Sequence, residues 1–138
     1  MELLRKNAQK IRFAIVGGAN TALDFLVLFI LVGLGLDRIA SNFVSTSVAL
    51  VFSFFVNKSF TFKSKDGSAR KQFGLFLAIT LFGLWVLQPI VILATEFVLS
   101  GTNWNEAAIL FIGKFLATLV TLVWNYVLYA RFVFKKKL

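Results

Sequence analysis

Long apolar runs, each followed by a short polar segment, dominate this sequence. A helix needs about 20 apolar residues to cross the hydrocarbon core of a bilayer. The pattern predicts four such helices, at about residues 13–36, 40–57, 73–99 and 107–129. Together with their loops, these helices use nearly the whole chain. We therefore predict an all-α membrane protein in which residues 1–138 form a single transmembrane domain.

The third predicted helix contains the only proline of the sequence, Pro89, directly after Gln88. Proline removes one hydrogen bond from a helix, and its ring clashes with the preceding turn. Membrane helices tolerate such a residue where other groups satisfy the released backbone atoms. We expect a kink or a break at this point.

Basic residues are concentrated in alternate polar segments. The five segments hold 4, 1, 5, 0 and 4 lysine or arginine residues in chain order. Short segments rich in lysine and arginine stay on the cytoplasmic side of a membrane. Both termini and the second loop are therefore predicted to be cytoplasmic. The basic residues of these three segments are Arg5, Lys6, Lys10 and Arg12; Lys58, Lys63, Lys65, Arg70 and Lys71; and Arg131, Lys135, Lys136 and Lys137.

The second and fourth predicted helices resemble each other. A shift of 72 positions lays residues 42–62 on residues 114–134 and gives seven identities in 21 positions. Both segments enter the membrane from the same side under the predicted orientation. The chain can therefore be interpreted as two repeated helical hairpins of the parallel kind.

The composition agrees with a membrane protein and excludes several functions. Hydrophobic residues make up 59% of the chain, and its mean hydropathy is +0.84. Cysteine and histidine are absent, so we expect no metal site and no cofactor. No glycine-rich phosphate loop or paired carboxylates occur, so an enzyme is not expected. The net charge of +9 lies in the loops, which argues against nucleic-acid binding.

Polar residues inside the predicted helices recur at helical spacing, so each set shares one face. Small and hydroxylated residues at such positions often serve helix packing alone. Charged residues inside a membrane more often mark a substrate path. The three stripes are Gly17, Asn20, Thr21 and Asp24 in the first helix; Asn42, Thr46, Ala49 and Ser53 in the second; and Lys114, Thr118, Thr121 and Asn125 in the fourth.

Asp24 and Lys114 are predicted to lie at similar depths. At about 1.5 Å per residue, Asp24 is roughly 16 Å from the inner end of its helix and Lys114 roughly 10 Å below the outer surface. An ion pair between them would neutralise both charges, either as part of a substrate path or as a purely structural contact. Arg12, Lys58 and Arg131 have two interpretations as well, as ordinary topology determinants or as ligands of a lipid phosphate.

Several motifs in the chain resemble the GtrA-like family of four-span bacterial membrane proteins. The opening motif is F-x-x-V-G-G-x-N-T-x-x-D-F, at Phe13–Phe25. The second helix closes with F-x-x-N-[KR]-x-[FW]-T-F, at Phe54–Phe62, and the chain closes with R-F-V-F, at Arg131–Phe134. The resemblance covers nearly the whole chain.

This resemblance implies a role in glycosylation of cell-surface polysaccharide or teichoic acid. Family members are thought to move undecaprenyl-phosphate-linked monosaccharides to the outer leaflet of the bacterial cytoplasmic membrane. A partner glycosyltransferase makes these lipids on the cytoplasmic leaflet. As a hypothesis, Arg12, Lys58 and Arg131 hold the phosphate. The sugar path would then comprise Asn20, Asp24, Asn57, Lys114, Thr118 and Asn125.

Two alternatives remain open. The protein could be a scaffold that anchors the glycosyltransferase and moves no lipid, or a small cation exporter that uses Asp24 as a proton-coupled carboxylate. Four helices do not easily enclose a polar head group, so we also expect a homo-oligomer.

Overall fold

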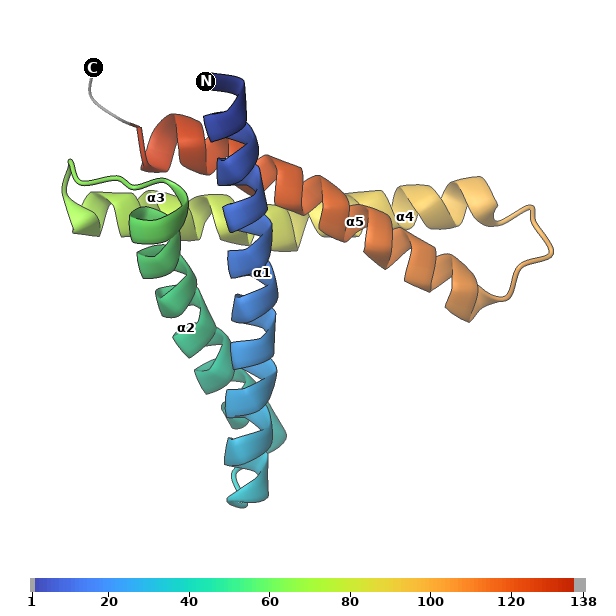
Figure 1. Ribbon diagram of the computed structural model, residues 1–138. Helices are drawn as coiled ribbons and strands as arrows, with labels where there is room; N and C mark the ends of the chain where they lie inside the picture. The colour runs from blue at the N-terminus through green and yellow to red at the C-terminus, as the bar shows by residue number, and fades with distance from the viewer. Residues whose placement is uncertain (1, 136–138) are drawn as a thin grey trace. The chain divides into compact units, whose positions relative to one another are not determined.

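The structure, a computed structural model, describes residues 2–135 (Figure 1). Every regular element within this range is a helix. Met1 and residues 136–138 lie outside the described residues, and with them Lys136 and Lys137 of the predicted basic C-terminal segment. The side chains of residues 2, 3, 5, 6, 38 and 39 lie outside the description too, among them those of Arg5, Lys6 and Arg38.

Four helices in the described range are long and apolar enough to cross a membrane. The prediction of an all-α membrane protein with four spans is therefore confirmed. The first span begins at Asn7 rather than at residue 13, because the helix continues beyond its apolar part into the basic segment. The four spans are Asn7–Gly33, Ala40–Thr61, Ala69–Leu99 and Glu106–Val133.

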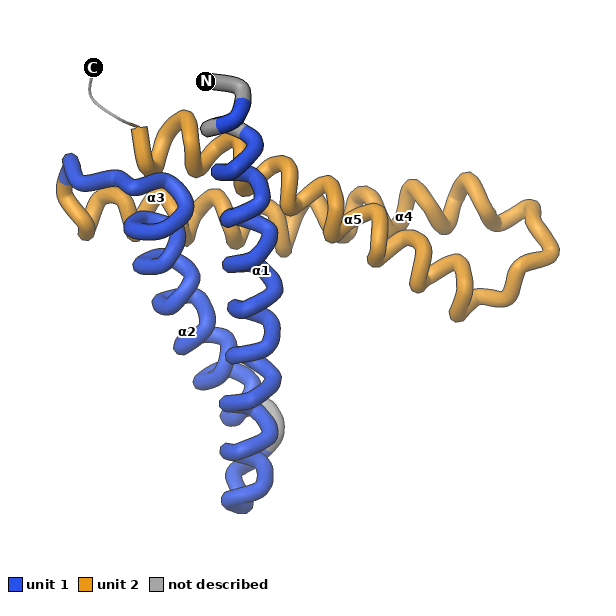
Figure 2. The backbone as a smooth tube through the Cα atoms, viewed as in Figure 1, with its two compact units in different colours: residues 1–67, 136–138 blue, residues 68–135 orange. Residues whose placement is uncertain are grey.

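The chain divides into two compact units, which Figure 2 shows in different colours. Among the described residues, unit 1 comprises residues 2–67 and unit 2 comprises residues 68–135. Each unit holds two consecutive spans and is a helical hairpin. This division agrees with the predicted pair of hairpins.

Unit 1 is a hairpin of two packed helices that ends in a π-helical turn. Gly35, in the connection between the helices, has a φ of 89°, a conformation that favours glycine. Asp37 stabilises the start of the second helix, because its carboxylate accepts a hydrogen bond from the Ala40 N–H at 3.1 Å. The elements are α1 (Glu2–Gly33), α2 (Arg38–Val56) and the π-helical turn η1 (Asn57–Thr61).

Small residues spaced four apart form the buried face of α2. Ser41, Ser45 and Ala49 are each at most 3% exposed. Small side chains allow helix backbones to approach closely in lipid. Of the predicted stripe, Ala49 belongs to this buried face, whereas Asn42 is exposed and Thr46 and Ser53 are half-buried. Close packing selects the smaller serine that precedes each of Asn42 and Thr46.

Unit 2 is also a hairpin, and its first arm is one continuous span of three elements. The second arm begins after Asn105, whose side chain accepts a hydrogen bond from the Ala108 N–H at 2.7 Å. This contact satisfies one of the free N–H groups at the helix start. The elements are α3 (Ala69–Phe82), η2 (Gly83–Leu87), α4 (Gln88–Leu99), α5 (Glu106–Leu128) and η3 (Tyr129–Val133).

The disturbance predicted at Pro89 takes the form of the π-helical turn η2. This turn lies directly before α4, in which Pro89 is the second residue. The Gln88 N–H donates to the Gly83 carbonyl oxygen, which closes a wider turn than that of an α-helix. The wider turn gives the proline ring room against the preceding carbonyls. The helix therefore continues through Pro89 instead of breaking there.

A row of residues spaced four apart forms the buried face of α5 and η3. Its contact with α4 is close, because a Cβ added to Gly113 would lie 3.4 Å from the Cα of Ile92. Four residues exceed one helical turn of 3.6, so the row drifts slowly around the helix axis. The buried members of the row are Ile109, Gly113, Ala117, Thr121, Tyr129 and Val133.

The 72-position repeat extends to the ends of both hairpins. The turn η1 begins at Asn57 and the turn η3 begins at Tyr129. Each turn is followed by a buried phenylalanine, Phe62 or Phe134. In both cases the phenylalanine N–H donates to the carbonyl oxygen five residues earlier, at 2.8 Å. The two hairpins thus share their register and their π-helical ends.

The predicted orientation can be tested with single cysteines, because the chain has none of its own. We expect Asn103→Cys, in the loop without basic residues, to react with a membrane-impermeant maleimide in intact cells. Lys65→Cys, in the basic loop, should react only after the membrane is permeabilised. The opposite labelling pattern would show that the charge rule fails here.

A substitution at Gly83 tests the close contact between η2 and α5. An added Cβ would lie 2.9 Å from the Thr121 Cγ2, so Gly83→Ala should lower the free energy of unfolding by about 1–3 kcal/mol. Unfolding by sodium dodecyl sulfate in detergent measures this loss. Gly74→Ala is the matched control, since its Cβ would meet no atom within 4 Å. Thr121→Ser should restore stability to the Gly83 variant; equal stability of the two alanine variants would show that the contact is not tight.

Candidate functional site

Arg12 lies at the basic end of unit 1, where α1 packs against η1. Its guanidinium lies over the Phe60 ring, 5.5 Å from the ring centre, in a cation–π contact. Phe13 and Phe62 make an edge-to-face contact beside it, with ring centres 6.3 Å apart. These contacts fix Arg12 against the same π-helical turn that carries Lys58. The two predicted phosphate ligands of unit 1 therefore belong to elements in direct contact.

Two sequence predictions join residues of different units. Arg131 is exposed in η3 of unit 2, whereas Arg12 and Lys58 belong to unit 1. Asp24 likewise belongs to unit 1 and Lys114 to unit 2. The shared phosphate site of the three basic residues and the Asp24 to Lys114 ion pair both stay predictions.

Five buried side-chain oxygen atoms of unit 1 have no hydrogen-bond partner among the described residues. An unsatisfied buried polar atom destabilises a protein by about 1–3 kcal/mol, and native structures contain few of them. Their concentration in one hairpin is the most distinctive chemical feature of this unit. The atoms are Asn20 Oδ1, Asp24 Oδ1, Ser41 Oγ, Asn57 Oδ1 and Thr61 Oγ1.

These oxygen atoms are held in place by the helices that carry them. Asn57 is 2% exposed, and its Nδ2 donates to the Ser53 Oγ at 3.1 Å, so its amide is fixed while its Oδ1 has no donor. Thr61, also 2% exposed, follows at the end of η1. Asn20 is the middle residue of the span Asn7–Gly33, and Asp24 follows one turn later. Unpartnered oxygen atoms therefore occur along the whole hairpin, from Ser41 in the first turn of α2 to Asn57 and Thr61 at its basic end.

Unit 2 satisfies its polar groups at the place equivalent to Asn57. Tyr129, which lies 72 positions later, is buried, and its hydroxyl hydrogen-bonds to the Thr80 Oγ1. The Thr80 hydroxyl donates in turn to the Phe76 carbonyl oxygen at 2.7 Å. The Phe76 and Tyr129 rings stack with their centres 4.6 Å apart. Unit 2 thus places a self-contained polar contact where unit 1 leaves an open acceptor.

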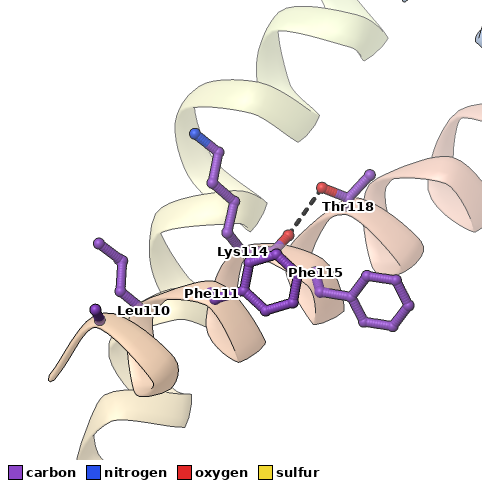
Figure 3. A pocket seen from close by; sticks show the side chains of 6 residues that line it. Leu110, Phe111, Lys114, Phe115 and Thr118 are labelled. Atoms are coloured by element: carbon purple, nitrogen blue, oxygen red, sulfur yellow. Dashed lines mark hydrogen bonds between the residues drawn. The ribbon is translucent and has the colours of Figure 1, made fainter. Parts of the chain in front are cut away.

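The predicted path residues of α5 differ in their exposure. Lys114 and Thr118 are exposed and line an open groove of about 460 Å³ (Figure 3). Asn125 is half-buried, and its Oδ1 would lie 3.5 Å from a Cβ added to Gly83. The three side chains thus differ in exposure, and their common role in a sugar path stays a prediction. Lys114 and Asn125 are separated by only about 20° around the helix axis, so they share one side of α5. The buried row drifts onto that side between them, so Asn125 is partly covered where Lys114 is exposed.

Sequence reasoning missed several polar residues of both units. Thr61 is part of the second motif, and its spacing of four from Asn57 was the available signal. Ser41 lies one residue before the predicted stripe of its helix. Tyr129 could have been found through the repeat, 72 positions after Asn57. Its partner Thr80 has no comparable signal, because the contact joins residues 49 positions apart.

Comparison with known proteins agrees with the resemblance drawn from the motifs. A protein-family model described as GtrA/DPMS, transmembrane domain, matches residues 12–134. The match includes both hairpins and all nine predicted site residues, from Arg12 to Arg131. No curated protein sequence matches the chain.

Tyr129, whose hydroxyl is hydrogen-bonded, and Asn57, whose Oδ1 has no partner, should respond differently to loss of their polar groups. Tyr129→Phe removes the hydroxyl that bonds to Thr80 and should lower the free energy of unfolding by about 1 kcal/mol. Asn57→Leu replaces an amide whose Oδ1 is unsatisfied and whose Nδ2 donates to Ser53 with an apolar group of similar size. It should leave the free energy of unfolding within about 1 kcal/mol of wild type, or raise it. Detergent unfolding compares the two, and a larger loss for Asn57→Leu would show that the asparagine amide stabilises the fold.

Proposed function

The chain belongs to the GtrA/DPMS transmembrane-domain family, and we propose that it moves polyprenyl-phosphate-linked monosaccharides across the bacterial cytoplasmic membrane. Such lipids would serve glycosylation of cell-surface polysaccharide or teichoic acid. The observation that carries this proposal is the set of buried, unpartnered oxygen atoms in unit 1. Polar groups inside a membrane are unfavourable, so a set without partners among the described residues points to a polar cargo.

The chemistry of these atoms suits a sugar. The Oδ1 atoms of Asn20, Asp24 and Asn57 are hydrogen-bond acceptors, and the Thr61 hydroxyl accepts and donates. A monosaccharide carries several hydroxyl groups, each of which can donate to one such atom. Binding a sugar would therefore satisfy groups that the hairpin itself leaves unsatisfied.

The other two parts of the lipid have matching surfaces. Arg12 and Lys58 carry positive charge at the basic end of unit 1, where they would bind the phosphodiester. Arg131 would contribute a third charge from unit 2. The prenyl chain stays in lipid, against exposed apolar side chains such as Phe25 and Phe29, whose rings stack 6.2 Å apart. Only the polar head then has to pass through the protein.

The partners follow from this role. A membrane-associated glycosyltransferase would load the sugar on the cytoplasmic leaflet, and the protein itself would perform no bond chemistry. Two thin hairpins enclose a head group poorly, so the carrier would act as a homo-oligomer. A scaffold for the glycosyltransferase and a proton-coupled cation exporter are the alternatives that the following test separates.

Translocation of a short-chain polyprenyl-phosphate-glucose analogue in liposomes tests the proposal. We expect purified wild-type protein to move the analogue across the bilayer. Asp24→Leu and Asn57→Leu should each slow this movement by about tenfold or more, because a lost hydrogen bond to a polar head is worth about 1.4 kcal/mol. The rate is measured from the analogue that becomes accessible to an enzyme added outside.

Thr21→Val is the matched control. Thr21 neighbours Asn20 but is exposed, and its hydroxyl donates to the Gly17 carbonyl oxygen at 3.0 Å. This variant should move the analogue at the wild-type rate. A folded wild-type protein that moves nothing above empty liposomes would favour the scaffold. Competition between a lipophilic cation and protons, without lipid movement, would favour the exporter.

A further inference from the structure

The open groove on α5 lies outside the polar interior of either hairpin. It has a volume of about 460 Å³ and is lined by Ala107, Leu110, Phe111, Lys114, Phe115 and Thr118, all from one helix. Figure 3 shows the Lys114 side chain extending from α5 with its ammonium group clear of the aromatic rings. Apart from Lys114 and Thr118, the lining is apolar.

Lys114 is a charge without a counter-charge among the described residues of unit 2. These residues include two acidic side chains inside the spans, Glu96 and Glu106, and neither forms an ion pair with Lys114. An isolated ammonium in the hydrocarbon region is unfavourable by several kcal/mol. Lys114 therefore needs an anionic partner or a route to the membrane surface.

The direction of the side chain favours the outer surface. Side chains on an α-helix tilt toward the helix N-terminus, and α5 begins at Glu106, on the outer side in the predicted orientation. The Lys114 Cα lies roughly 12 Å along the axis from Glu106. Its long, flexible stem shortens this distance further, so the ammonium reaches the level of outer-leaflet head groups.

The groove offers one charge and almost no further hydrogen bonding. The Thr118 hydroxyl already donates to the Lys114 carbonyl oxygen at 2.8 Å. A sugar would find few partners here, in contrast to the unpartnered acceptors of unit 1. A phosphate monoester carries about −1.5 to −2 charges at pH 7 and suits a single ammonium better than a singly charged phosphodiester.

We propose that this groove binds sugar-free polyprenyl phosphate in the outer leaflet. Lys114 holds the phosphate monoester, and the isoprenoid chain lies against Phe115 and then follows α5 toward the middle of the membrane. This inference rests on the proposed function, because such a lipid remains once a transported sugar has been handed on. The protein would thus bind the loaded lipid through unit 1 and the emptied lipid through α5.

Farnesyl phosphate binding tests this site. Native mass spectrometry measures its binding to the full-length protein in detergent. Lys114→Gln should weaken binding about tenfold or more, and Lys114→Arg should retain it. Lys135→Gln, which removes an exposed charge at the end of unit 2, should leave binding unchanged. Binding should also weaken below about pH 6, where the monoester loses its second charge.

Two control lipids show whether the phosphate monoester is what the groove binds. Farnesol should not bind at the concentrations used, because it lacks the phosphate. Equal binding of phosphatidylglycerol, or equal affinity of the wild-type and Lys114→Gln proteins, would overturn the proposal. Lys114-dependent binding together with a failed liposome assay would uphold this site and reject the carrier function. Movement of the sugar lipid, together with farnesyl phosphate binding that does not depend on Lys114, would support the carrier function and reject this site.

Discussion

Close contact between helix backbones along rows of small residues is the constraint on which this structure depends. In lipid no hydrophobic effect drives helices together, because the solvent is as apolar as the side chains. Packing must supply the attraction, and dispersion forces are appreciable only at short range. The serines and alanine of α2, and Gly113 and Ala117 of α5, provide that short range. Each hairpin is built around such a row.

The π-helical turns follow from the same packing. At η2 the wider turn accommodates Pro89 while Gly83 stays in contact with α5. Trp124 of α5 packs against the same part of the first arm. Its Nε1 donates to the Ile79 carbonyl oxygen at 3.2 Å, and its ring stacks on Phe82. A side chain of the second arm thus adds a hydrogen bond to a backbone carbonyl of the first, which also accepts from the Gly83 N–H. At η1 and η3 the extra residue turns a phenylalanine into the core.

The sequence allowed most of the fold to be predicted, and less of the site. Length and hydropathy specify four spans, and the 72-position repeat specifies two hairpins. The π-helical turns could not be predicted, because they depend on contacts between segments far apart in the chain. Asn20, Asp24 and Asn57 were found by their polarity within apolar runs. A helical wheel places Lys114 and Thr121 on one face. It takes no account of the drift of the packed row, which buries Thr121 and leaves Lys114 exposed.

The two hairpins share a register but differ in the polar residue that each places at the start of its final turn. Asn57 and Tyr129 occupy equivalent positions, yet only the tyrosine has a complete set of contacts. This is the arrangement expected after duplication of an ancestral hairpin and divergence of the copies. Unit 2, with Tyr129, can keep the packing that both hairpins inherited. Unit 1, with Asn57, is then free to evolve a new binding specificity. Under the proposed function, selection for a different sugar would then change residues of the first hairpin and spare the second.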